Sequence, residues 1–157
     1  MNRVNTSLGE QTGGWSNVSI LTSDELVESP DVLTNDNAGS IVIESIEDGL
    51  DILPVGENIK ITEPLQKTKS GFVYNIKGEF EIACQSKTVD TYLNNYLDKK
   101  VVLIATKHYG QRKLYGSKKF PLSFSYQSVS GQKYEDGSRV RITVQGKIPQ
   151  KPVFMGD

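Results

Sequence analysis

Cysteine and histidine are almost absent from this chain of 157 residues, which contains one of each. The lone cysteine, Cys84, excludes an intramolecular disulfide and any multi-cysteine metal site. The sequence has no run of eighteen apolar residues, so we expect no membrane-spanning helix and no membrane partner. Residues 1–30 lack the apolar segment of a secretory signal, and we therefore expect no secretory route.

Residue sets typical of catalysis are also missing. His108 is the only histidine, and no serine lies in a GxSxG motif. His108 could form a dyad with Cys84, but Cys84 falls on the apolar face of a predicted strand, where cysteine is usually inert. Glu79 and Glu81 share the polar face of that strand, which normally faces solvent, whereas glycoside hydrolysis needs two carboxylates across a cleft. We predict that the protein is not an enzyme.

Phosphate-binding and metal-binding motifs are absent as well. Neither GxxxxGK[ST] nor GxGxxG occurs. The segment TNDNAGSIVIES, residues 34–45, loosely echoes a calcium loop, but its acids do not have the EF-hand spacing. Turn chemistry explains its Asn, Asp and Gly residues better. We expect no metal and no cofactor.

The net charge of −1 hides a division along the chain. Residues 1–66 carry two basic side chains against twelve acidic ones, a balance of −10, and residues 67–157 carry sixteen against seven, a balance of +9. If the two halves interleave in one domain, their opposite charges cancel. Alternatively, complementary patches can join identical subunits head to tail. A nucleic-acid partner would explain only the basic half.

Residues 1–38 are rich in Asn, Ser, Thr, Gly and Asp, and their apolar residues occur singly or in short clusters. Such a segment buries too little apolar surface to become ordered alone. We predict an extended N-terminal arm over residues 1–38 that a neighbouring chain holds, or else the chain's own body. The candidate contacts of the arm are Trp15, Val18, Ile20 and Leu21.

Residues 39–157 read as a β domain. Apolar and polar residues alternate from Phe72 to Cys84, which predicts a strand with one buried face, and Gly78 in that face predicts a bulge or tight bend. The apolar run 101–105 predicts a strand buried on both faces. Segments 40–43 and 59–61 predict short strands, and the alternating segments 122–127 and 139–148 predict an antiparallel hairpin with one polar face.

One amphipathic helix is predicted near residues 88–100. Ser86 or Thr88 would cap it, and Lys99 and Lys100 would lie at its C-terminal end. The apolar stripe that would pack on the sheet consists of Val89, Tyr92, Leu93, Tyr96 and Leu97. The predicted fold is mainly β: an antiparallel β-sandwich or open barrel with one helix and an extended N-terminal arm.

A cationic segment rich in tyrosine, residues 107–119, lies between two predicted strands. Its two Tyr-Gly pairs predict turns at either end of a short strand, 111–115. Three interpretations stay open: a solvated loop, a contact with another subunit, or a platform for single-stranded nucleic acid. The candidate contact residues are Lys107, Tyr109, Arg112, Lys113, Tyr115, Lys118 and Lys119. The apolar tail residues Val153, Phe154 and Met155 pack in the core or contact a neighbour.

The run LNNYLDKKVVLIATKHYGQRKLYGSKKFPLSFSYQS and the later VRITVQGKIPQKPVF resemble small virion proteins of tailed bacteriophages. The likeness is greatest to neck and tail ring components of crAss-like phages of Bacteroidales. It covers about residues 71–155 and depends on the order of strand, helix, strand, basic loop and hairpin, without a diagnostic motif.

This resemblance implies a non-enzymatic ring subunit of the connector between portal and tail. Its partners would be identical copies and other virion proteins such as portal or tail components. It would be located in the virion, after synthesis in the host bacterial cytoplasm. The second interpretation is a nucleic-acid-binding β-barrel that uses the basic loop. A glycan-binding module would favour exposed tryptophans, and the chain has only Trp15.

Overall fold

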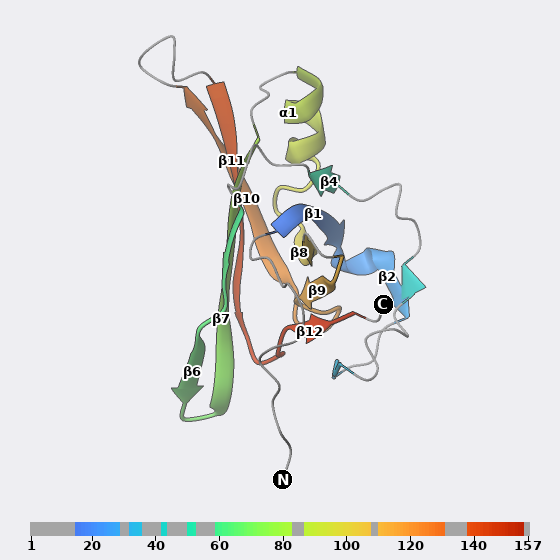
Figure 1. The fold of residues 1–157 in the computed structure, drawn as a ribbon, viewed down its shortest axis with the longest axis vertical. Coiled ribbons are helices and arrows are strands. Elements are labelled where there is room, and N and C mark those ends of the chain that lie inside the picture. The colour runs from blue at the N-terminus through green and yellow to red at the C-terminus, as the bar shows by residue number, and fades with distance from the viewer. Residues whose placement is uncertain are drawn as a thin grey trace.

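The computed structural model describes residues 15–28, 32–35, 42–43, 50–52, 59–82, 87–107, 110–130 and 138–155. Within these residues, ten strands join one antiparallel sheet (Figure 1). Two further strands, β2 (Leu26–Glu28) and β3 (Val42–Ile43), pair with each other. One α-helix, α1 (Lys87–Asn94), accompanies the sheet, so the predicted mainly β class is confirmed.

The large sheet curls into two layers. The first layer contains β5 (Ile59–Thr62), β6 (Leu65–Thr68), β7 (Gly71–Ile82), β11 (Ser138–Ile148) and β10 (Leu122–Ser130). The second layer contains β4 (Leu50–Ile52), β1 (Trp15–Thr22), β8 (Lys100–Lys107), β9 (Arg112–Tyr115) and β12 (Val153–Phe154). The layers are continuous at one corner, where the start of β10 pairs with the start of β8. In Figure 1 the long strands of the first layer run past the shorter strands of the second.

The main core lies between these two layers, and α1 covers one end of it. The predicted alternation explains why: Ile76 and Phe80 of β7 point inward, whereas Asn75, Lys77 and Glu79 point outward. Residues 101–105 are all buried, as predicted, because β8 carries apolar side chains on both faces. The inner side chains of the hairpin partners β10 and β11 are Leu122, Phe124, Val140, Ile142, Val144 and Ile148.

Gly78 does not form the predicted bulge. The pairing of β7 with β11 keeps one register through this residue, and β5 pairs with it on the other side. A Cβ atom at Gly78 would lie 3.2 Å from Cδ2 of Leu103 in the second layer. The missing side chain therefore leaves room for Leu103, and it does not mark a kink.

Residues 15–22 of the predicted arm are held by the chain's own body, which is one of the two alternatives that the sequence left open. These residues form β1, which pairs with β4 on one side and with β8 on the other. Val18 and Ile20 are fully buried and Leu21 is 2% exposed, so all three belong to the chain's own core. The backbone groups of this polar segment pair with β4 and β8, and its few apolar side chains pack into the hydrophobic clusters on the two faces of its strand. Residues 1–14 of the predicted arm lie outside the described residues.

The helix is shorter than predicted, and its buried stripe is narrower. It begins at Lys87, so Thr88 lies within its first turn, and Ser86 is outside the described residues. It ends at Asn94, a turn follows in which Asp98 adopts a φ of 63°, and Lys100 already belongs to β8. Leu93 and Tyr96 are buried and Val89 packs partly against the core, whereas Tyr92 and Leu97 are exposed.

Candidate interaction surfaces

The cationic segment contains the predicted short strand, β9, which pairs with β8 and β12. Its Tyr115 is 2% exposed and meets the ring of Trp15 edge-on, with the ring centroids 6.3 Å apart. Burial, followed by the negative charge of Glu63, raises the pKa of Tyr115 far above its usual range. The ring of Tyr115 is therefore a core group, and it is not available to stack on a nucleic-acid base.

Lys113 is also occupied inside the protein. Its ammonium group pairs with the carboxylate of Glu63, which follows β5 in the first layer. The same ammonium lies 5.5 Å from the ring centroid of Tyr115 and 5.0 Å from that of Phe154. Because β9 and β5 belong to different layers, this ion pair joins the layers away from the continuous corner.

The remaining residues of the predicted loop contact have different surroundings. Arg112, Lys118 and Lys119 are exposed, and Tyr109 is outside the described residues. Lys107 is half-buried, with its ammonium 5.1 Å from the ring centroid of Trp15. The structure thus leaves three cations on the surface and buries the ring of Tyr115. The ammonium of Lys119 lies 5.7 Å from the ring centroid of Phe120.

The C-terminal tail packs mainly on its own chain. Val153 is buried and pairs with Leu114, and the amide of Met155 donates a hydrogen bond to the carbonyl of Arg112. Phe154 and Met155 are partly exposed. The sequence left two expectations for the tail, packing in the core or contact with a neighbour. Val153 packs in the core.

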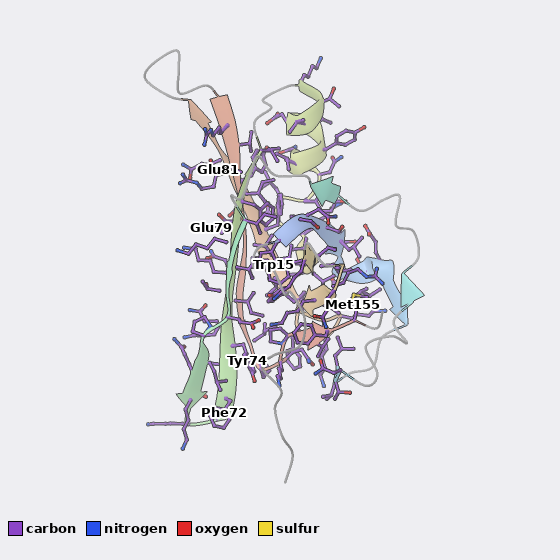
Figure 2. The ribbon with its side chains drawn as sticks, viewed as in Figure 1. Trp15, Phe72, Tyr74, Glu79, Glu81 and Met155 are labelled. Atoms are coloured by element: carbon purple, nitrogen blue, oxygen red, sulfur yellow. The ribbon has the colours of Figure 1, made fainter. Side chains whose placement is uncertain are left out.

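The polar face of the first layer carries a network of charges. Arg139 and Arg141 both bind the carboxylate of Glu81, at 3.2 and 3.0 Å. The hydrogen bonds from Arg141 and then Arg139 hold the pKa of Glu81 below its ordinary value of 4.5. A groove of about 570 Å³ follows this network toward Lys60 on β5. Figure 2 shows Glu79 and Glu81 on the side of β7 that faces away from the second layer.

A second surface, which sequence reasoning missed, lies on the hairpin of β6 and β7. Leu65 pairs with Tyr74 and Lys67 pairs with Phe72, so these side chains share one face. Every residue of β6 is exposed, and Leu65 and Phe72 are 53% and 57% exposed. Figures 1 and 2 show this hairpin extending beyond the second layer, with Phe72 near its tip. We call Leu65, Lys67 and Phe72 the hairpin patch.

A third surface lies at the other end of the molecule, beside α1. A pocket of about 330 Å³, which we call the helix pocket, is lined by Lys87, Val89, Asp90, Leu93, Tyr126, Ser128 and Val140. The hydroxyl of Tyr126 donates a hydrogen bond to Oδ1 of Asp90 at 3.3 Å. Burial, followed by the nearby charge of Asp90, raises the pKa of Tyr126, so this hydroxyl keeps its proton. Two more exposed apolar side chains belong to the helix and the turn after it: Tyr92 lies on α1, and Leu97 follows its end.

The signal for the hairpin patch was present in the sequence. Phe72 opens the alternating stretch, and the period of two places it on the same predicted buried face as Ile76 and Phe80. The face is continuous as predicted, but the second layer covers only its later part. Alternation identifies which side chains share a face, and it does not show where the covering layer stops.

No protein-family model, curated protein or solved structure matches the chain. Among the described residues, no group of three or more His, Cys, Asp or Glu side chains could hold a metal ion. In the same part of the chain, no helix is long and apolar enough to cross a bilayer.

Proposed function

We propose that this chain is a non-enzymatic structural subunit that assembles with identical copies, as the resemblance to phage neck and tail rings implies. The hairpin patch supports this proposal most directly. Leu65 and Phe72 are large, apolar and more than half exposed on a two-stranded extension of the sheet. A two-stranded hairpin gains little stability alone, and its uncovered apolar face favours a partner.

The outer edge of the sheet makes side-chain docking a better explanation than added strands. β5 and β6 follow each other along the same edge of β7, with Pro64 between them. Lys60 and Lys67 lie on this edge and are exposed. Proline and lysine on an edge strand oppose pairing with another strand. A partner of the hairpin therefore binds its apolar face.

The alternative of nucleic-acid binding has less support. Its stacking platform required Tyr115, which is buried, and its cations included Lys113, which is paired with Glu63. Arg112, Lys118 and Lys119 could still contact phosphates. Of the tyrosines proposed for this platform, Tyr115 is the one that the structure describes, and its buried ring contacts Trp15 and cannot stack on a base.

Assembly is tested by measuring the mass of the purified protein over a range of concentrations, by sedimentation velocity and mass photometry. We expect one defined oligomer, and the fraction of protein in it should increase with concentration. Negative-stain electron micrographs should show closed rings. A monomer at every concentration tested would refute the proposal. Replacing Arg112, Lys118 and Lys119 with alanine should leave the oligomer intact.

A further inference from the structure

We propose that the hairpin patch of one copy docks in the helix pocket of the next copy, so that subunits join head to tail. This inference rests on the proposed function, because it specifies the surfaces through which identical copies meet. The two surfaces are built from different elements and lie at opposite ends of the long axis of the molecule (Figure 1). Surfaces with this arrangement form a heterologous contact, which gives rings or filaments and not a two-fold dimer.

The two surfaces match in shape. The hairpin patch lies on the projecting part of the β6–β7 hairpin, with every residue of β6 exposed and Phe72 near the tip. The helix pocket has a volume of about 330 Å³ and is partly lined by the apolar side chains of Val89, Leu93 and Val140. One aromatic ring fits in such a volume. The exposed Tyr92 on the same helix would add apolar surface around the docked ring.

The two surfaces also match in charge. Lys67 is exposed and pairs across the hairpin with Phe72, so its ammonium accompanies the ring into the contact. Among the described residues that line the pocket, Asp90 is the one carboxylate. Within the described residues, its carboxylate accepts a hydrogen bond from the neutral hydroxyl of Tyr126. Lys87 also lines the pocket, and its positive charge would repel Lys67. The ammonium of Lys67 should therefore lie beside Asp90 and away from Lys87.

Two substitutions disable the surfaces one at a time. Phe72→Asp places a charge on the hairpin patch, and Ser128→Arg fills the helix pocket from an exposed position on β10. Each should weaken self-association tenfold or more, because about half of a phenylalanine side chain is available to be buried in the contact. Val32→Asp is the matched control, since Val32 is 66% exposed and belongs to neither surface.

Mixing the two variants is the decisive experiment. Phe72→Asp keeps an intact pocket and Ser128→Arg keeps an intact hairpin, so each alone should be a monomer, and an equimolar mixture should form dimers and nothing larger. Sedimentation velocity measures the species, and circular dichroism with urea unfolding verifies that both variants are folded. Val32→Asp should assemble like the unmodified protein.

The possible results separate this inference from the proposed function. If the unmodified protein is a monomer, the proposed function itself is wrong. If the unmodified protein assembles and Phe72→Asp assembles equally well, copies associate through other surfaces and only the docking inference is overturned. If both variants are monomers but their mixture forms no dimers, the contact is not head to tail between these surfaces, and the inference is again overturned.

Discussion

The ion pair between Lys113 and Glu63 should contribute more to stability than any other pair on the described surface, because it joins the two layers. The Lys113 side chain is 14% exposed and that of Glu63 is 35% exposed. One carboxylate oxygen of Glu63, Oε2, is buried and has no hydrogen-bond partner among the described residues. Replacing Lys113 with methionine keeps most of the apolar stem and leaves this carboxylate without its cation.

The magnitude follows from the burial of the pair. Removing one partner from a fully buried pair costs about 3–5 kcal/mol, and an exposed pair contributes about 0.2–1 kcal/mol. Glu63 lies between these limits, so Lys113→Met should lower the free energy of unfolding by about 2 kcal/mol. For a chain of this length, that corresponds to a fall in melting temperature of about 4–8 °C.

Urea unfolding of four proteins measures the coupling: the unmodified chain, Lys113→Met, Glu63→Leu and the double variant. The double variant should regain most of the stability lost in Lys113→Met, because an apolar pair leaves no unpaired charge. Lys77→Met is the control, since Lys77 pairs with Glu79 on the surface at 3.1 Å and is 52% exposed. Its loss should be below about 0.5 kcal/mol. Equal losses in the two lysine variants, or additive effects in the cycle, would refute the reasoning.

Three further predictions concern packing and pH. Gly146→Ala should lower the free energy of unfolding by about 1–3 kcal/mol in urea titrations, because its Cβ would lie 2.7 Å from Cδ2 of the buried Leu122. The folded-state pKa of Glu81 is below its ordinary value of 4.5, so its stabilising effect is present above that pH and is lost as the pH falls. The folded-state pKa of Tyr115 is raised, so the unfolded chain ionises first and stability falls as the pH rises above the ordinary value of 10.0. Glu81→Gln and Tyr115→Phe should each flatten their part of the stability–pH curve.

Each of these predictions has a result that would contradict it. An Ala variant of Gly146 with unchanged stability would mean that Leu122 moves aside freely. If Glu81→Gln loses stability on acidification as steeply as the unmodified chain, other carboxylates dominate the acid limb. If Tyr115→Phe unfolds at the same alkaline pH, the buried tyrosine is not the group that titrates.

Much of the first layer was predictable from the sequence, because one face of its strands is exposed to solvent and the other is buried. Alternation identified β7, β10 and β11 and assigned their inner residues, and the uninterrupted apolar run identified β8 as buried on both faces. The helix was identified by its periodicity, although only Val89, Leu93 and Tyr96 contact the core. These signals are local: they depend on residues two to four positions apart.

Which residues of the cationic segment are exposed depends on the tertiary structure. The sequence grouped Tyr115 and Lys113 with the exposed Arg112, Lys118 and Lys119, because all lie within one short segment. The fold separates them, since alternate residues of β9 face Trp15 and Glu63 from distant parts of the chain.

The sequence by itself determined which side chains share a face of each strand, and hence the mainly β class. Only the tertiary structure decided which faces are covered. Val18 and Ile20, in a polar segment, are buried because pairing with β4 and β8 places their strand in the second layer, where these side chains pack in the core between the layers. Phe72, in the most regular apolar stretch, is exposed because the second layer ends before it. Burial is a property of what packs on a face, and the covering residues are dozens of positions away in the chain.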